Sequence, residues 1–402
     1  MFVGGWIEDA HSSRRFSKGA LVEEFTAVVY KCISGLPPTG EINNLCFKGK
    51  WQREAPKCEV VCDTSPIRDT SISSLCDIGG VQTPCSGYVK SGTQAVITCQ
   101  KGYERGESDE QISHCSESGT WSPKPKPCSP ICGIPKSEVK FGIGRHRLPD
   151  YSVMPWIAGI YRTNWFNRLV CIGTIINARV VGFSAHCLTR ASDMETFNAT
   201  DIRVVVGELR SGTLTESYSG EANQTIRAAA IWQTGYQDLP NTRIRDFGLI
   251  ILEKDIIFGD VVAPICIEFG AKNFVPKGEL GYYIGYEEQV EGDLPPLDAM
   301  VVQVLEGKDC KEHVADWFKP HFSDEAFCTG PMNETDKGIC GGENGSSLTI
   351  PKEINGRTVF FLHGFLSVYE KNDGCQSQVH VVVSSVHYFQ DFFGLVGTHK
   401  PR

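Results

Sequence analysis

The amino-acid sequence predicts an all-β protein in which small disulfide-bonded modules precede one large β domain. The chain has 17 cysteines in 402 residues, which is typical of disulfide-bonded extracellular proteins, and their spacing does not match paired zinc-binding knuckles. An internal repeat of roughly 60 to 70 residues, with a shorter first copy, lies before residue 130. The remaining chain contains runs of β-branched and apolar residues with few amphipathic helical stretches, which favours a large barrel or sandwich.

The composition limits the classes of function. A hydrophobic content of 41% over 402 residues predicts at least two folded units. A formal net charge of −9 without any run of Lys or Arg argues against nucleic acid as a partner. No stretch reaches about 18 uninterrupted apolar residues, so we expect no transmembrane helix. No motif indicates a cofactor or a metal site.

The compartment is deduced mainly from the cysteines, which predict a secreted, extracellular glycoprotein. Possible N-glycosylation sites lie at Asn198, Asn223 and Asn333. The start of the chain has an early apolar tract but no basic region followed by a longer apolar one, so it does not have the pattern of a signal peptide. We therefore leave residues 1–21 unassigned.

The two copies of the repeat cover residues 22–59 and 60–130. The first reads VVYKC, LCFKGKW and APKCE, and the second reads AVITCQKGY, HCSESGTW and PKPCS. These patterns, with Trp51 and Trp121 before the last cysteine, resemble complement control protein modules, also called sushi domains. Bridges substitute for core area in modules of this size, contributing about 2 to 4 kcal/mol each.

The resemblance to sushi modules implies pairings between the first and third cysteines and between the second and fourth. The second copy carries an additional pair of cysteines. The first copy lacks its first cysteine, so Cys46 has no partner within the module. We expect that the true N-terminus lies upstream, with an intermolecular bridge through Cys46 as the alternative. The implied pairs are Cys62–Cys115, Cys99–Cys128, Cys76–Cys85 and Cys32–Cys58.

Three short motifs lie in the large domain, residues 131–402. Each alone is a weak signal, and their order along the chain makes them informative. They are SAHC around His186, DFGL beginning at Asp246, and CGGENG with Asn344 as its fifth residue. DFGL alone is also found in kinases, but no glycine-rich nucleotide loop or HRD motif accompanies it. Together with the Pro155–Trp156 pair, the series resembles the chymotrypsin-like serine proteases. The resemblance implies a two-barrel domain in which His186 and Asp246 match the family and Asn344 occupies the position of the serine nucleophile.

The same resemblance assigns further residues. It implies that Gly342 belongs to the oxyanion hole, and that Gly338, Ser367 and Tyr369 lie at the specificity pocket. Its disulfides would be Cys171–Cys187, Cys310–Cys328, Cys340–Cys375 and Cys132–Cys266.

Several departures from the family indicate that this chain does not cleave peptide bonds. An asparagine amide cannot replace the serine hydroxyl, because its nitrogen is delocalised into the carbonyl. Glu343 stands where the family has an Asp that receives the new N-terminus, and Gly338 stands where trypsin-like members have Asp. Tyr369 would narrow the pocket.

The activation segment and the neighbouring serines also indicate that the chain does not cleave peptide bonds. Cleavage after Lys140 or Arg145 would not produce the usual N-terminus. Ser346 and Ser347 lie two and three residues past the nucleophile position, too far along the chain to replace it.

The architecture predicts a secreted serine protease homologue. It resembles modular proteases of arthropod immune cascades, complement proteases and haptoglobin, and implies extracellular proteins as partners. The leading hypothesis is a catalytically inactive cofactor, decoy or scaffold in an extracellular proteolytic cascade of innate immunity. The alternatives are an active serine endopeptidase and a haptoglobin-like ligand-binding protein.

Overall fold

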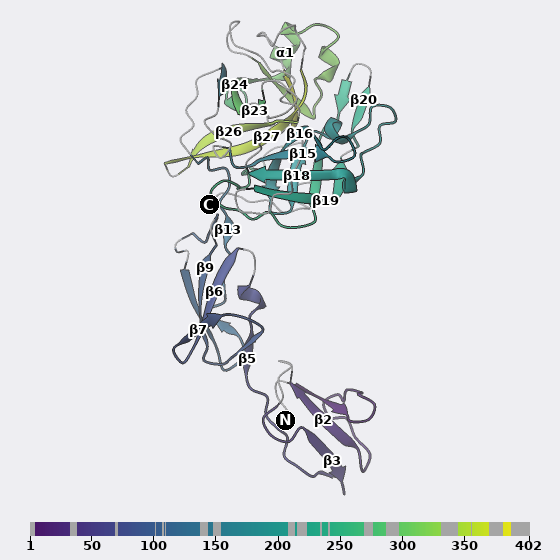
Figure 1. Cartoon of the computed structure of the whole chain (residues 1–402), viewed down its shortest axis with the longest axis vertical. Coiled ribbons are helices and arrows are strands. Elements are labelled where there is room, and N and C mark those ends of the chain that lie inside the picture. The colour runs from purple at the N-terminus through teal and green to yellow at the C-terminus, as the bar shows by residue number, and fades with distance from the viewer. Residues whose placement is uncertain are drawn as a thin grey trace. The chain divides into compact units, whose positions relative to one another are not determined.

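The computed structural model divides into two compact units, residues 1–129 and 130–402, and its elements are shown in Figure 1. It describes residues 5–32, 38–68, 71–100, 102–106, 108, 110–136, 144–147, 154–207, 214, 223–233, 235–239, 242–268, 276–286, 297–330, 345–354, 356–369 and 381–386. Within these residues, no helix has the length and hydrophobicity needed to traverse a bilayer.

The first module is a four-stranded antiparallel sheet in the order β1-β2-β3-β4. Its alternating burial, as in AVVYKC of β2, reflects a strand with one face on the core. Strand β1 pairs with β2, so the sheet begins upstream of residue 22, within the segment left unassigned from the sequence. The strands are β1 (Gly5–Asp9), β2 (Ala27–Cys32), β3 (Asn43–Phe47) and β4 (Lys50–Trp51).

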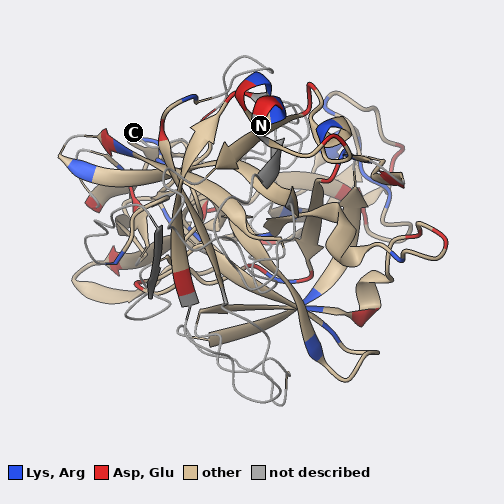
Figure 2. Cartoon of the chain, turned by 90° about the horizontal axis from the view of Figure 1, so that it is seen from above, with Lys and Arg blue, Asp and Glu red and all other residues tan. Residues whose placement is uncertain are grey.

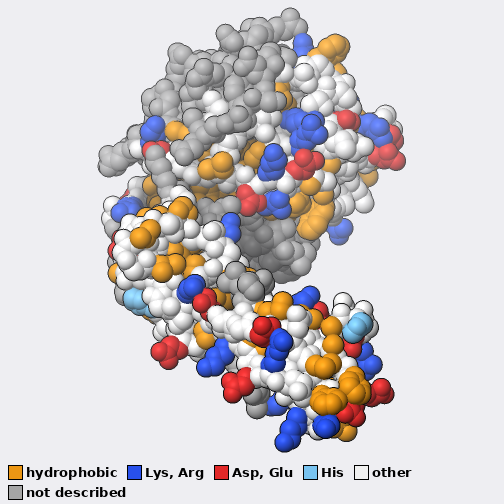
Figure 3. Space-filling view, turned by 60° about the horizontal axis from the view of Figure 1, so that its bottom comes forward, with side chains coloured by type: hydrophobic (Ala, Val, Ile, Leu, Met, Phe, Trp, Pro, Cys, Tyr) orange, Lys and Arg blue, Asp and Glu red, His pale blue; other side chains and the backbone are white. Residues whose placement is uncertain are grey.

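The second module contains a five-stranded sheet in the order β12-β11-β9-β6-β7 and a separate β5-β8 pair. Large hydrophobic side chains remain exposed on the modules (Figure 3). The elements are β5 (Val61–Asp63), η1 (Ser65–Ile67), β6 (Ile72–Ile78), β7 (Val81–Pro84), β8 (Tyr88–Lys90), β9 (Gln94–Cys99), β10 (Tyr103–Glu104), β11 (Glu110–Cys115), β12 (Trp121–Ser122) and β13 (Ser129–Pro130).

The second unit begins with a closed six-stranded barrel in the order β15-β16-β17-β22-β19-β18. Its strands are buried almost continuously, as IAGIYR of β15 shows. The elements are β15 (Ile157–Arg162), β16 (Arg168–Asn177), β17 (Val180–Phe183), η3 (Ala185–Leu188), η4 (Ala199–Asp201), β18 (Ile202–Gly207), β19 (Asn223–Gln233), β20 (Gln237–Leu239), β21 (Thr242–Ile244) and β22 (Gly248–Leu252).

The rest of this unit forms a seven-stranded sheet in the order β14-β24-β23-β26-β27-β28-β25, and an additional pairing of β24 with β25 curls it. The all-β expectation is therefore confirmed. In Figure 2, acidic and basic residues alternate along the ribbon without forming a segment of one sign. The elements are β14 (Gly144–Arg147), β23 (Leu280–Tyr286), β24 (Leu297–Leu305), α1 (Gly307–His313), η5 (Lys319–His321), β25 (Ala326–Gly330), β26 (Ser347–Ile354), β27 (Arg357–Tyr369) and β28 (Val381–Ser385).

The barrel and the curled sheet pack directly on each other. Trp156 is fully buried and its ring lies 5.3 Å from that of Phe360. A Cβ on Gly182 of β17 would lie 2.6 Å from the ring of Phe365 on β27, so only glycine allows this approach. The joint between the two halves is therefore tightly packed, and the candidate site lies on it.

Seven disulfides link the cysteines that the two resemblances pair, and Cys46 is free and buried. The eighth pair, Cys340–Cys375, lies outside the described residues. The bridges are Cys32–Cys58, Cys62–Cys115, Cys76–Cys85, Cys99–Cys128, Cys132–Cys266, Cys171–Cys187 and Cys310–Cys328.

A substitution at Gly133 tests how tightly the start of the second unit packs against the curled sheet. Its φ is +64°, and an added Cβ would lie 2.2 Å from the carbonyl oxygen of Phe360. We expect Gly133→Ala to lower the free energy of unfolding by roughly 3 kcal/mol, from strain and overpacking together. The matched control is Gly356→Ala, where φ is +75° but no atom lies within 4 Å, with an expected loss of about 1 kcal/mol. Equal losses in urea unfolding would contradict the packing argument.

Candidate active site

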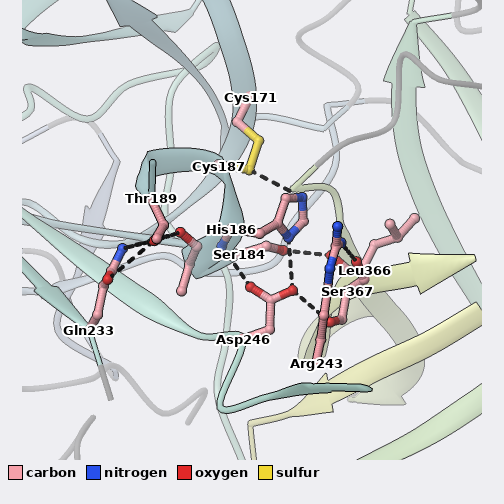
Figure 4. Close-up of a disulfide and its surroundings, with 11 residues drawn as sticks. Cys171, Ser184, His186, Cys187, Thr189, Gln233, Arg243, Asp246, Leu366 and Ser367 are labelled. Carbon is pink, nitrogen blue, oxygen red and sulfur yellow. Dashed lines mark hydrogen bonds and ion pairs between the residues drawn. A yellow bond between two sulfur atoms is a disulfide. The ribbon is translucent and has the colours of Figure 1, made fainter. Parts of the chain in front are cut away.

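His186 is presented by the short 3-10 helix η3, which follows directly from barrel strand β17. Ser184 follows the strand as the N-cap residue of η3, in an extended conformation, and its hydroxyl donates to the carbonyl of Leu366, 2.6 Å away on β27. The neighbouring Cys187 is bonded to Cys171 of β16. The helix that carries His186 is thus fixed on one side by a disulfide and on the other by the curled sheet (Figure 4).

Asp246 lies just before β22 of the barrel and faces His186 on the same side of this joint (Figure 4). The side chain is 1% exposed. One carboxylate oxygen accepts the backbone N–H of His186 at 2.8 Å, and the other lies 2.8 Å from Nδ1 of the imidazole. The second oxygen also accepts the hydroxyl of Ser367 at 2.6 Å. This buried carboxylate therefore accepts hydrogen bonds from both halves of the unit, the barrel side and the curled sheet.

Two opposing influences act on the pKa of Asp246. Burial, the largest single influence, raises it, whereas the charge of His186 and the hydrogen bonds from His186 and Ser367 lower it. The lowering effects prevail together, and the pKa lies below its ordinary value. Asp246 is therefore an anion at neutral pH.

The anion determines which imidazole nitrogen carries the proton. In the neutral imidazole the single N–H then lies on Nδ1, where it donates to Asp246, and Nε2 is the nitrogen with the lone pair. Within the described residues, the polar contact of Nε2 is with Sγ of Cys187, 3.8 Å away. The His186–Asp246 pair therefore has the geometry of a base held in its working tautomer.

The serine nearest in sequence to the nucleophile position is engaged elsewhere. Ser346 is 1% exposed, and its hydroxyl donates to the carbonyl of Ile284 at 2.8 Å and accepts the N–H of Ile284 at 3.0 Å. Ser347 is 7% exposed, and its hydroxyl accepts that of Thr174 at 2.7 Å. Both hydroxyls therefore make hydrogen bonds to groups in the interior of the fold.

Gly345 places the end of the CGGENG motif beside the Cys171–Cys187 bridge. Its φ is +78°, and an added Cβ would lie 2.6 Å from the carbonyl of Ile172 and 2.7 Å from Sγ of Cys171. Only glycine fits so close to the Cys171–Cys187 bridge. The residue that follows Asn344 in sequence therefore packs against the disulfide that holds η3.

Comparison with protein-family models gives two matches, "Trypsin" over residues 143–393 and "Sushi repeat (SCR repeat)" over residues 76–132. The chain belongs to the trypsin family. The sushi match falls mainly in the second predicted module, while the assignment of residues 22–59 as a partial sushi module stays a prediction.

Curated relatives of this trypsin-family chain differ in the activity that their names state. Clotting factor C of Tachypleus tridentatus is 24% identical over 321 residues, which cover 77% of this chain and 30% of the relative. Mannan-binding lectin serine protease 1 of Homo sapiens is 23% identical over 413 residues (97% and 55%), and inactive serine protease PAMR1 of Xenopus tropicalis is 22% identical over 417 residues (90% and 56%). The chain therefore spans from under a third to just over half of the length of these relatives.

The structure describes only some of the predicted site residues of this trypsin-family chain. Those brought together are His186, Asp246 and Ser367. Tyr369 ends β27, where its backbone pairs with Val381. The remaining predicted site residues, Gly338, Gly342, Asn344 and the glycosylation candidate Asn333, lie outside the described part of the chain, as does Glu343.

Arg243 was not predicted from the sequence, yet it contacts the site. Its guanidinium donates to the main-chain carbonyl of Ser367 at 2.7 Å (Figure 4). Its backbone N–H donates to Nδ1 of His321 at 3.2 Å, and its Nε lies 3.4 Å from the carboxylate of Asp238. Ser367 lies at a register shift in the β27–β28 pairing, and Arg243 caps its carbonyl.

A metal site at this position conflicts with the covalent structure. Ligand atoms of Cys171, His186 and Cys187 lie within 4.8 Å of one another, but both sulfurs are in one disulfide. Cysteine binds metals as the thiolate. This cluster therefore holds no ion in its oxidised form.

The other two glycosylation candidates differ in exposure. Asn198 is exposed and caps η4 by accepting the N–H of Thr200 at 3.2 Å. Asn223 begins β19, is half-buried and pairs with Gly207. Modification at both stays a prediction.

The lowered pKa of Asp246 predicts how stability depends on pH. The unfolded carboxyl titrates near its ordinary value of 3.8, and the folded one titrates lower. Its stabilising contribution is therefore complete above about pH 4 and is lost as the pH falls from there through the folded pKa. Asp246→Asn is expected to be less stable than the native chain at pH 7, by an amount that shrinks below about pH 4 in urea unfolding.

The control for this pH series is Asp255→Asn, because Asp255 forms an exposed ion pair with Arg179. We expect a small effect there at every pH. A penalty for Asp246→Asn that stays constant or grows toward acid pH would contradict the assigned sign.

Proposed function

We propose that this chain is a secreted serine protease homologue that acts by binding rather than by cleavage. The observation that carries the proposal is Asn344 in the nucleophile position of a chain whose His186–Asp246 pair has working geometry. The mechanism of the family needs a hydroxyl whose proton the imidazole removes. An amide nitrogen delocalised into its carbonyl is a very poor nucleophile, and loss of the nucleophile in a related triad costs about a million-fold in rate.

Replacement of the missing hydroxyl by a neighbouring serine is disfavoured by the contacts of Ser346 and Ser347. Each hydroxyl makes a hydrogen bond to a buried group of the unit's interior. Turning either toward His186 would leave that buried group without its partner, at a cost of about 1 to 3 kcal/mol. Neither serine is therefore positioned as a substitute.

Other requirements of cleavage are also altered. Arg243 caps the carbonyl of Ser367 at the edge next to Asp246, so an approaching peptide would have to displace a charged hydrogen bond. Glu343, Gly338 and Tyr369 depart from the family pattern, and the stretch from Lys140 to Arg145 lacks the usual activation sequence. These changes are separate from Asn344 and support the same conclusion.

Retention of His186 and Asp246 has a structural explanation. Asp246 accepts hydrogen bonds from η3 and from β27. Removing one partner of such a buried group leaves the other uncompensated and destabilises the fold. The pair can therefore persist as a structural joint without catalysis.

The proposed setting is an extracellular proteolytic cascade of innate immunity, in which the chain is a cofactor, decoy or scaffold for cascade proteases or recognition proteins. The disulfides favour an oxidising compartment. The relatives include proteins named as a clotting factor, a mannan-binding lectin serine protease and an inactive serine protease. Glycosylation at Asn198 would fit the same compartment.

The second candidate is an active serine endopeptidase. The geometry of His186 and Asp246 favours it, as does similarity over 97% of the chain to a relative named as a serine protease. It requires a hydroxyl at or near position 344.

Covalent labelling distinguishes the two candidates. The purified chain, before and after limited proteolysis, is expected to show no fluorophosphonate labelling and no cleavage of peptide substrates, because Asn344 has no hydroxyl and the hydroxyls of Ser346 and Ser347 are bonded elsewhere. Trypsin serves as the positive control. Labelling that disappears in His186→Ala would establish the endopeptidase instead.

Restoring the hydroxyl tests whether Asn344 is the single defect. Asn344→Ser is expected to remain at background in fluorogenic peptide assays, because Glu343, Gly338 and the Arg243 cap on Ser367 are unchanged. Its unfolding midpoint should match that of the native chain, which excludes misfolding as the reason. Strong peptide cleavage by this variant would show that one substitution alone separates the chain from an active protease.

A further inference from the structure

The two-stranded hairpin of β20 and β21 precedes the barrel strand β22 and is hydrogen-bonded to the other half of the unit at several points. The hydroxyl of Thr242 donates to the carbonyl of Pro320 at 2.9 Å, and the N–H of Arg243 donates to Nδ1 of His321 at 3.2 Å. The guanidinium of Arg243 donates to the carbonyl of Ser367 at 2.7 Å (Figure 4). The hairpin therefore lies against η5 and β27, and one of these contacts depends on a histidine.

The end of the hairpin nearest to Asp246 has a separate attachment. The N–H of Arg245 donates to the carboxylate of Glu325 at 2.9 Å, and its Nε lies 3.5 Å from the same carboxylate. Arg245 has a φ of +54°, a left-handed conformation that is costly for a non-glycine residue and persists where the surrounding contacts hold it. This attachment contains no imidazole. The hairpin thus has one end fixed at Arg245 and another end, at Arg243, that depends on His321.

His321 is buried, with 8% of its surface exposed. Two charged groups of the hairpin, Arg243 and Asp238, act on its imidazole, whereas Lys319 on its own helix is paired with Asp316. Burial is the largest influence and lowers the pKa of His321 below its ordinary value of 6.5. The charge of Arg243 lowers this pKa further, and the charge of Asp238 opposes the shift. The closed arrangement of the hairpin therefore favours the neutral imidazole.

The hydrogen bond from Arg243 exists only while the imidazole of His321 is neutral. Nδ1 accepts through its lone pair, so the single N–H of the neutral ring lies on Nε2. An imidazolium has an N–H on both nitrogens. It would place a donor against the N–H of Arg243 and a positive charge beside its guanidinium. Protonation of His321 therefore favours an arrangement in which this end of the hairpin has left η5.

We propose that His321 is a pH-sensitive latch, which holds the β20–β21 hairpin against η5 and β27 at neutral pH and releases its Thr242–Arg243 end in acid. Release would uncover the carbonyl of Ser367, which Arg243 caps beside Asp246. The released imidazole takes up a proton near its ordinary pKa of 6.5, and the closed one only at a lower pH. The latch is therefore complete above about pH 6.5 and weakens as the pH falls below that value, whether or not the chain cleaves peptides.

Hydrogen–deuterium exchange of the full chain tests the latch, measured by mass spectrometry and corrected for the intrinsic exchange rate at each pH. Peptides that cover β21 contain the reporting N–H of Arg243. They are expected to lose protection at least about tenfold between about pH 7.5 and about pH 5, which corresponds to the loss of roughly one hydrogen bond. Peptides that cover the barrel strand β18 are the internal control and should keep their protection.

Two substitutions of His321 separate titration from simple loss of a contact. His321→Asn keeps an acceptor oxygen near the position of Nδ1 but does not titrate, so β21 should be protected equally at both pH values. His321→Leu removes the acceptor, so β21 should be equally unprotected at both. His186→Asn is the matched control, because His186 is bonded to Asp246 and not to the hairpin, and it should keep the pH response. Retained protection of β18 shows that each variant is folded.

The proposal is overturned if the native chain protects β21 equally at the two pH values, or if His321→Asn loses protection in acid as the native chain does. Loss of the pH response in His186→Asn would also overturn it, because the response would then belong to the other imidazole of the site. A parallel loss of protection in β18 would mean that acid unfolds the whole unit, and no latch would be needed to explain the result.

Discussion

The buried carboxylate of Asp246 is the interaction on which the second unit depends. An anion removed from water is costly unless hydrogen bonds compensate it, and this one accepts the backbone N–H and imidazole of His186 and the hydroxyl of Ser367. Because those donors come from η3 beside the barrel and from β27 of the curled sheet, the carboxylate fixes the two halves together. The geometry of the pair therefore follows from folding, before any chemistry is considered.

The surrounding packing makes this joint rigid. The Phe365 ring leaves room only for glycine at position 182, and the hydroxyl of Ser184 bonds across to Leu366. A site held in this way keeps its shape when the nucleophile is absent, because none of these contacts involves position 344. A protease fold can thus retain its His–Asp pair while its use changes from cleavage to binding.

Sequence predicted the parts of the site that local motifs define. His186 precedes a cysteine and Asp246 precedes a short aliphatic strand. The resemblances to the sushi and chymotrypsin-like families implied the seven bridges that the structure contains. The contacts of Asp246 with Ser367 and of Arg243 with Ser367 could not be predicted, since they join residues 121 and 124 positions apart through a bulge in β27. Strand β1 was also missed, because a five-residue segment pairs with β2 through tertiary context rather than a strong local pattern.

Asp246 thus acts as a structural joint between the barrel and the curled sheet. The most direct test is a double-mutant cycle of Asp246→Ala and Ser367→Ala, measured by urea unfolding at pH 7. We predict a coupling free energy of about 1 to 3 kcal/mol between the two positions, because each removes the other's partner. A coupling near zero would mean that the hydrogen bond across the joint does not stabilise the fold, and would contradict the account.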